Sequence, residues 1–221
     1  AFFDKRSKFI HYSPNNLVIN NIEFDHADIF EDIDDIKKQF HHLIKIIPQS
    51  GNIIFFKEDE NTNDLINKGI WCNKVEINSD LISVNLDKKI LKVDGIEYSL
   101  INLPLLGENN LKNYVCAILA AKLGGVNIKE SIDSLKNFKG VKRRMDLVYE
   151  STKLNIYDDF AHHPTAIQLS CKGIKTQSPD KKILGIIELG SNTMSSGYHK
   201  ENLLSSYKLL DKVFVLDQNK I

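Results

Sequence analysis

Short apolar runs alternate with a segment of helical periodicity at the start of the chain, and this order constrains the fold more than any other feature. Residues 17–20 and 53–56 are short apolar runs of the kind that form buried strands. Between them, apolar residues recur at positions 33, 36, 40, 43, 44 and 47, which predicts an amphipathic helix ended by Pro48. A strand–helix–strand order is typical of a parallel sheet, so we expect an α/β fold.

The pattern then changes from parallel to antiparallel signals. Asp94-Gly95 separates two alternating runs at 90–93 and 96–100, which predicts a tight hairpin. The Ala-rich segment at 111–123 is predicted to be a helix. A shorter segment at 128–138 is predicted to be another helix, with Asn127 as its cap. We therefore expect an antiparallel hairpin followed by two helices.

A second change of pattern at residues 139–151, with a glycine and a run of basic residues, predicts a domain boundary. We divide the chain into domains 1–138 and 139–221. Beyond the boundary a second α/β unit is expected, with strands at 153–158, 182–188 and 212–216 and helices at 164–175 and 200–210.

Composition excludes several classes of protein. The 29 basic side chains balance 29 acidic ones, so no basic field is available for nonspecific binding to nucleic acid or membrane. No apolar run approaches the roughly 18–20 residues that cross a bilayer. Three widely spaced cysteines are too few for a disulfide framework or a four-cysteine zinc site, so we expect free thiols and a cytoplasmic protein.

The two ends of the chain predict that it is a piece of a longer protein. The first residue is Ala1, not Met, and the last strand-like run at 213–216 lies close to the end. The sequence also contains neither a G-x-x-x-x-G-K-[ST] loop nor a G-x-G-x-x-G loop.

A first candidate site follows the strand expected at 17–20. Glu23, Asp25, His26 and Asp28 place three carboxylates and one imidazole within six positions. Ligands of open α/β sheets bind beyond the carboxyl ends of the strands, and these side chains are suited to a divalent metal. The alternative is a solvated loop in which an aspartate caps the next helix.

A second candidate site lies at residues 157–165, where a strand end, a turn and a helix start meet. The paired acids Asp158 and Asp159 stand close to His162 and His163. A helix N-terminus adds N–H donors and a partial positive charge that favour an anion. The alternative is a capping aspartate with two exposed histidines.

Three further stretches carry polar groups suited to a ligand. The basic run at 140–144 can clamp a phosphate, or it is a solvated charge run. Asn110 and Asn113 share one helix face and can contact a base edge, or cap the helix. Residues 188–194 can approach a ligand, or form an ordinary loop.

Taken together and in this order, the stretches resemble the Mur ligase family, the ATP-dependent amide-forming enzymes of peptidoglycan metabolism. The cues are AFFDKRSKF, NNIEFDHADIF, QFHHL, DDFAHHPTAI and SNTM, which together span essentially the whole chain. The resemblance implies a UDP-sugar-binding domain, a central ATPase domain and a Rossmann-like C-terminal domain. Residues 1–138 would be the later part of the central domain and residues 139–221 the first part of the C-terminal one. The N-terminal domain of the same polypeptide would be missing, and we expect the chain alone to be inactive.

The resemblance also implies roles for particular residues, with ATP and Mg²⁺ as cofactors. His26 matches a metal-ligand position. The nucleotide would be contacted by Asn110 and Asn113 at the adenine and by Arg144 and Asp159 at the phosphate and ribose. His162 and His163 are the catalytic candidates, and Ser191, Asn192 and Thr193 would lie near the incoming peptide.

Within the family, the cues are most similar to the branch that joins UDP-N-acetylmuramate to the murein tripeptide L-Ala-γ-D-Glu-meso-diaminopimelate during peptidoglycan recycling. DDFAHHPT also suits the branch that adds L-alanine, so that alternative stays open. Asn109 replaces the usual histidine and Gly190 the expected arginine, which favours altered recognition or a non-catalytic remnant that binds a partner. A family-free alternative is a metal-dependent hydrolase that uses His26, Asp28, Asp158 and His162.

Overall fold

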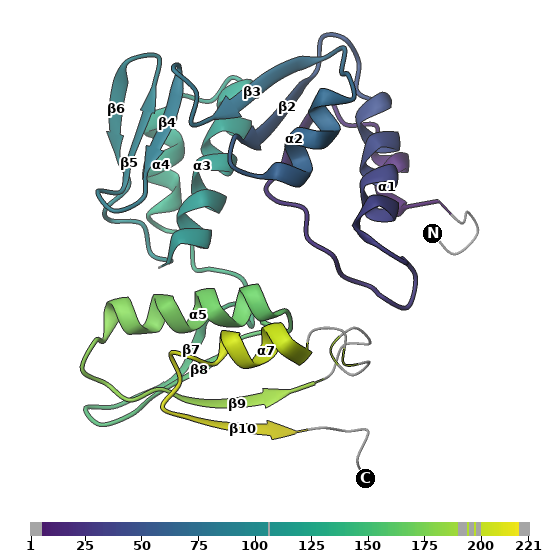
Figure 1. Ribbon diagram of the computed structural model, residues 1–221. Coiled ribbons are helices and arrows are strands. Elements are labelled where there is room, and N and C mark those ends of the chain that lie inside the picture. Colours follow the sequence, from purple (N-terminus) through teal and green to yellow (C-terminus); the bar gives the residue numbers. More distant parts are fainter. Residues whose placement is uncertain (1–5, 106, 190–193, 195–196, 198–199, 217–221) are drawn as a thin grey trace. The chain divides into compact units, whose positions relative to one another are not determined.

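The computed structural model describes residues 6–105, 107–189, 194, 197 and 200–216 (Figure 1). The chain divides into two compact units. The first unit comprises residues 1–103 and 111–136, and the second comprises residues 104–110 and 137–221. Each unit has α/β architecture, as expected from the sequence.

The first unit is built on a parallel sheet of three strands in the order β1-β2-β3. Its elements follow the predicted order, with helix α1 between the first two strands. They are the 3-10 helix η1 (Lys8–Tyr12), β1 (Asn16–Ile19), α1 (Ile33–Lys45), β2 (Asn52–Phe56), α2 (Glu60–Asn67) and β3 (Asn73–Ile77).

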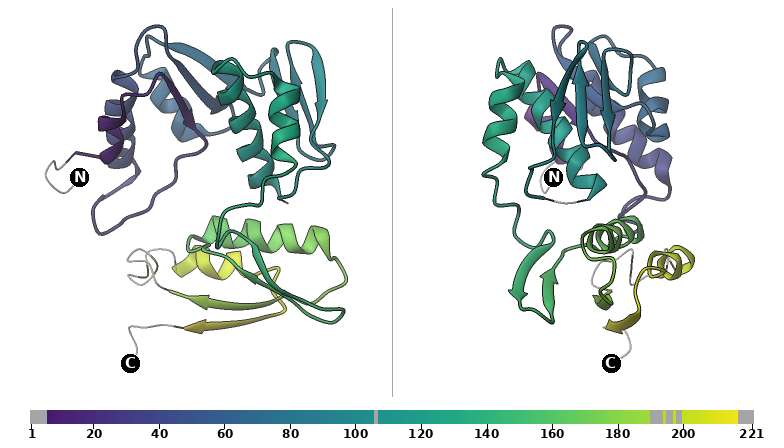
Figure 2. Two further views of the ribbon diagram at one scale, coloured as in Figure 1. Left: turned by 180° about the vertical axis from the view of Figure 1, so that it is seen from behind. Right: turned by 90° about the vertical axis from the view of Figure 1, so that its left-hand side faces the viewer.

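The central strand β2 is buried on both faces, which explains its unbroken apolar run. Ile53 and Phe55 pack with residues of α1 and α2 in one core cluster. Phe56 belongs to the opposite face, where Lys112 of α3 (Glu108–Leu123) lies over its ring at 5.2 Å. Figure 2 shows helices on both sides of this sheet. Burial of both faces is the usual environment of a parallel sheet.

The predicted hairpin is present within a separate antiparallel sheet of three strands. This sheet contains β4 (Ile82–Asn85), β5 (Ile90–Val93) and β6 (Ile96–Ser99). Asp94 and Gly95 have φ angles of 51° and 83°, the left-handed pair that a two-residue turn needs. Helix α4 (Ile128–Leu135) completes the unit, and Asn127 caps it by accepting a hydrogen bond from the Lys129 N–H at 2.8 Å.

Helix α2 has no counterpart among the sequence-based expectations. It is short, and only Thr62, Leu65 and Ile66 are buried. Asp59 starts it by accepting a hydrogen bond from the Thr62 N–H at 2.8 Å. The helix therefore depends on a polar cap and on packing against the rest of the unit more than on a long apolar stripe.

The second unit contains an antiparallel strand pair and a parallel strand pair. Its elements are β7 (Asp146–Glu150), β8 (Asn155–Asp158), α5 (Pro164–Gln177), β9 (Leu184–Glu188), α7 (Lys200–Ser206) and β10 (Lys212–Leu216). Ile187 of β9 contacts a core cluster that includes Ile167 and Cys171 of α5. The neighbouring Ile186 belongs to the other face of the strand and is 86% exposed.

Two further observations concern the described part of the chain. All three cysteines are free and buried. None of the helices that the structure describes is both long and apolar enough to cross a membrane.

Candidate functional site

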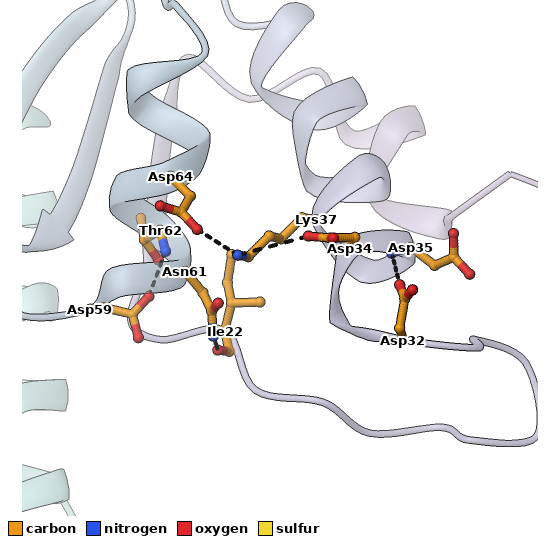
Figure 3. Close-up of polar contacts among 9 residues, drawn as sticks. All are labelled: Ile22, Asp32, Asp34, Asp35, Lys37, Asp59, Asn61, Thr62 and Asp64. Atoms are coloured by element: carbon orange, nitrogen blue, oxygen red, sulfur yellow. Dashed lines mark hydrogen bonds and ion pairs between the residues drawn. The ribbon is translucent and has the colours of Figure 1, made fainter.

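The loop that follows β1, residues 20–32, carries the first group of candidate side chains. Ile22 is buried in the core, and its carbonyl oxygen accepts a hydrogen bond from Asn61 Nδ2 of α2 at 2.7 Å (Figure 3). Asp32 ends the loop as the cap of α1, since its side chain accepts a hydrogen bond from the Asp35 N–H at 3.0 Å. Both ends of the β1 loop are therefore fixed to helices.

His26 occupies a strained position at the tip of this loop. Its φ angle is 58°, in the left-handed region that a residue with a Cβ adopts at a cost. Its carbonyl oxygen accepts hydrogen bonds from the N–H groups of Ile29 at 2.8 Å and Phe30 at 3.0 Å. Its own N–H donates to Asp25 Oδ1 at 2.7 Å. The backbone thus forms a tight turn that displays an exposed imidazole.

The side chains of the β1 loop supply only part of a metal site. His26 Nδ1 lies 3.9 Å from Asp28 Oδ1, and Glu23 accepts a hydrogen bond from Asn21. Among the described residues, no group of three or more His, Cys, Asp and Glu side chains is placed to hold a metal ion. A metal bound at His26 would therefore need ligands from outside this set, and His26 as a ligand stays a prediction. The hydrolase alternative also requires a metal cluster, and the described part of the chain contains no such group of His, Cys, Asp and Glu side chains.

Three polar groups meet where α3 passes the end of β1. Asn20 Nδ2 donates to Asn113 Oδ1 at 2.6 Å, and Cys116 Sγ lies 3.8 Å from Asn20 Oδ1. Burial raises the pKa of the Cys116 thiol to about 12, so the thiol stays protonated and remains a donor. Because Asn113 Oδ1 accepts from Asn20, the NH₂ group of Asn113 is left to donate elsewhere. Sequence reasoning found Asn113 but missed Asn20.

Candidate residues of the second unit gather around Phe160, just beyond β8. The Cζ atoms of Arg143 and Arg144 lie 5.3 Å and 5.5 Å from the centre of its ring. Arg143 Nε also lies 3.4 Å from Asp158 Oδ2. His162 Nδ1 lies 2.8 Å from the Phe160 carbonyl oxygen. The structure thus brings together Arg144 and His162, which the sequence singled out separately.

Asp159 and His163 have partners on α5. The Asp159 carboxylate accepts a short hydrogen bond from Ser170 Oγ. His163 is the N-cap of the helix, and its Nδ1 accepts from the Thr165 N–H at 3.4 Å. Both side chains therefore have a local structural role, and their predicted roles at a ligand stay predictions. Ser191, Asn192 and Thr193, together with Gly190, lie outside the described residues.

Comparison with known proteins decides the family. Residues 3–121 match the Mur ligase middle domain, and residues 143–221 match the Mur ligase glutamate ligase domain. The chain belongs to the Mur ligase family. Both expected parts of that family are thus present in the expected order.

Two curated members of the Mur ligase family are similar over nearly the whole chain. Both are named UDP-N-acetylmuramate–L-alanyl-γ-D-glutamyl-meso-2,6-diaminoheptandioate ligase. The one from Escherichia coli strain K12 is 38% identical over 98% of this chain, and the one from Haemophilus influenzae is 35% identical over all of it. The alignments cover 49% and 50% of those proteins, so the chain spans about half the length of the relatives it matches.

A solved Mur ligase structure is also similar to this chain. The murein peptide ligase from Psychrobacter arcticus 273-4 superimposes with a TM-score of 0.69 and 34% sequence identity. The superposition covers 97% of this chain and 46% of that structure. The similarity therefore extends across both units of the chain.

Proposed function

We propose that this chain is part of an ATP-dependent ligase that joins UDP-N-acetylmuramate to L-Ala-γ-D-Glu-meso-diaminopimelate for peptidoglycan recycling. The observation that carries the proposal is the 38% identity, over 98% of the chain, to a relative named for this reaction. Two further observations support the proposal. The chain contains both a Mur ligase middle domain and a glutamate ligase domain. Polar candidate side chains lie in each unit, with Asn113 in the first and Arg144 in the second. Free buried thiols favour a cytoplasmic setting.

The reaction that we propose has two steps. The carboxylate of UDP-N-acetylmuramate attacks the γ-phosphorus of ATP, which forms an acyl phosphate and releases ADP. The free amine of the tripeptide then attacks the acyl carbon, and the amide forms as inorganic phosphate leaves. The chemistry requires cations and N–H donors around the phosphates, and exclusion of water from the acyl phosphate.

We assign the described residues to the nucleotide in this reaction. The NH₂ group of Asn113, oriented by Asn20, would donate to an acceptor on the adenine, with Asn110 one helical turn away. The Arg144 guanidinium would bind a phosphate, and Asp159 the ribose. His162 and His163 stay the catalytic candidates, although His163 also caps α5.

Magnesium, when bound, would offset the charge of the phosphates. His26 and Asp28 are the residues of this chain that we propose to contribute to its site. The described residues place no group of three or more His, Cys, Asp and Glu side chains to hold a metal ion, so we infer that water and further residues complete the site. We also propose that the 221 residues alone do not turn over, because they contain no P-loop to bind the β- and γ-phosphates.

The test is to express the complete reading frame that contains this chain and to measure ADP release with UDP-N-acetylmuramate and ATP. Release that depends on the tripeptide supports the proposal. Release that depends on L-alanine instead supports the alanine-adding alternative. ATP binding without release in either mixture would support a non-catalytic remnant and overturn the proposed activity.

A further inference from the structure

The Phe160 ring contacts the side chains of two arginines and one histidine, which come from two segments of the second unit. Its ring lies within 5.5 Å of the Cζ atoms of both Arg143 and Arg144. The His162 ring meets it edge-on, with centroids 4.8 Å apart and an interplanar angle of 70°. Contacts of this length are within the range in which a cation is attracted to the face of an aromatic ring.

The backbone of Phe160 joins the same partners. Its N–H donates to the Arg143 carbonyl oxygen at 2.8 Å, and its carbonyl oxygen lies 2.8 Å from His162 Nδ1. Because a carbonyl only accepts, Nδ1 of His162 carries the proton in this contact. Phe160 therefore holds the basic segment and the His162 ring in place through its own ring and through its own backbone N–H and carbonyl groups.

The basic segment has an unusual backbone that makes this arrangement possible. Neighbouring side chains on an extended strand lie on opposite faces, so two adjacent arginines would not both reach one ring. Here Arg143 and Met145 have φ angles of 58° and 54°, which turns the chain on either side of Arg144. The strain at these two residues accompanies the convergence of both guanidinium groups on Phe160.

The two arginines differ in their charge environment. The Arg143 guanidinium is paired with Asp158, at 3.4 Å between Nε and Oδ2. Arg144 is exposed, and within the part of the chain that the structure describes it forms no ion pair. Arg144 thus keeps its positive charge and its five N–H donors for an anion, while the aromatic ring restricts its position.

We propose that Phe160 is a positioning residue that pre-orients Arg144 for a nucleotide phosphate, a role that rests on the function proposed above. The ring is 48% exposed, so it is not a core side chain whose loss would leave a buried cavity. Its contribution is to reduce the freedom that a long arginine side chain loses on binding. The aromatic face, more than the bulk of the side chain, is the property required.

The experiment compares Phe160→Leu, which removes the aromatic face, with Phe160→Tyr, which keeps it. Phe214→Leu is the matched control, because Phe214 is 49% exposed and lies under the Lys212 ammonium at 4.7 Å. Tripolyphosphate is titrated into the 221-residue chain at fixed salt, and the arginine Nε–H signals are followed by NMR. Removing the aromatic face is expected to weaken binding about three- to tenfold, whereas Phe160→Tyr and Phe214→Leu bind like the wild type.

A second measurement separates this inference from the proposed function. In the absence of anion, the Arg144 Hδ protons of the wild type are expected to show upfield ring-current shifts that disappear in Phe160→Leu and persist in Phe160→Tyr. Missing shifts, equal binding by Phe160→Leu and wild type, or weak binding by Phe160→Tyr would each overturn the positioning role. Shifts without any tripolyphosphate binding would instead overturn the phosphate contact assigned to Arg144.

Discussion

Lys37 Nζ of α1 lies 2.7 Å from Asp64 Oδ2 of α2, and this ion pair joins the two helices that cover one face of the parallel sheet (Figure 3). The Lys37 side chain is only 8% exposed, whereas that of Asp64 is 60% exposed. The contact therefore provides a partner for a nearly buried ammonium group.

We expect Asp64→Asn to lower the stability of the first unit in a pH-dependent way. The hydrogen bond from Lys37 lowers the pKa of Asp64 below its ordinary value of 3.8. A carboxylate with a depressed pKa stabilises the fold above its unfolded-state pKa, and this contribution is lost as the pH falls through the folded-state value. Urea midpoints should therefore differ from wild type at pH 6 and converge below pH 3.8. Asp34→Asn, whose carboxylate is 4.0 Å from the same amine, is the control and should have a smaller effect.

The strained backbone at His26 predicts an unusual order of stability. His26→Gly should be more stable than His26→Ala by about 1 kcal/mol, because glycine adopts a positive φ without a Cβ clash. Urea denaturation of both variants measures the difference. Equal stability of the two variants would show that the turn relaxes when the imidazole is removed.

The cysteines should be poorly reactive in the folded chain. Burial is the main cause that raises the pKa of all three thiols, to about 12 for Cys116. At pH 8 the thiolate fraction of Cys116 would be about 10⁻⁴, and the thiolate is the reactive form. We expect an aromatic disulfide reagent to titrate three thiols quickly in denaturant and slowly without it. Fast reaction of one thiol in native buffer would contradict the burial of that cysteine.

Asn20→Asp should reverse the hydrogen bond that orients Asn113. A carboxylate at position 20 only accepts, so the Asn113 amide would turn its NH₂ group toward it and present its oxygen to a ligand. In the complete protein, we expect adenine nucleotides to bind about tenfold more weakly, which corresponds to one lost hydrogen bond. Calorimetric titration measures the effect.

A matched substitution controls for the added charge in that experiment. Asn52 Nδ2 donates to Asn16 Oδ1 at 2.7 Å, a second exposed pair of asparagines in the same unit. Asn52→Asp makes the same chemical change away from α3 and should leave nucleotide affinity unchanged. Equal weakening by both variants would show that charge, and not the orientation of Asn113, is responsible.

The sequence predicted the elements whose stability depends on an apolar pattern. The strand–helix–strand opening and the hairpin at Asp94-Gly95 follow from local periodicity and turn chemistry, and both are present. Helix α2 was missed because a polar cap and three buried residues leave little periodic signal. Strand β7 was missed because all five of its residues are exposed and only its pairing with β8 identifies it.

In the candidate site, too, the residues that have a local sequence signal were predicted and the others were missed. Residues within one short motif, such as His26 or His162, are visible as local clusters of polar letters. Asn20 was missed because its partner Asn113 is 93 positions away, and no local pattern connects the two. Phe160 was missed because an aromatic residue between an aspartate and an alanine gives no sign of the ring contacts that only the folded chain creates.

The exposed face of β9 and β10 has a consequence for handling this chain in solution. Leu184, Ile186 and Phe214 are between 49% and 86% exposed, on a sheet to which the described residues contribute two strands. Apolar side chains beside open strand edges favour pairing between molecules. Self-association should therefore increase with protein concentration. Light scattering should fall when Ile186 is replaced by a charged residue.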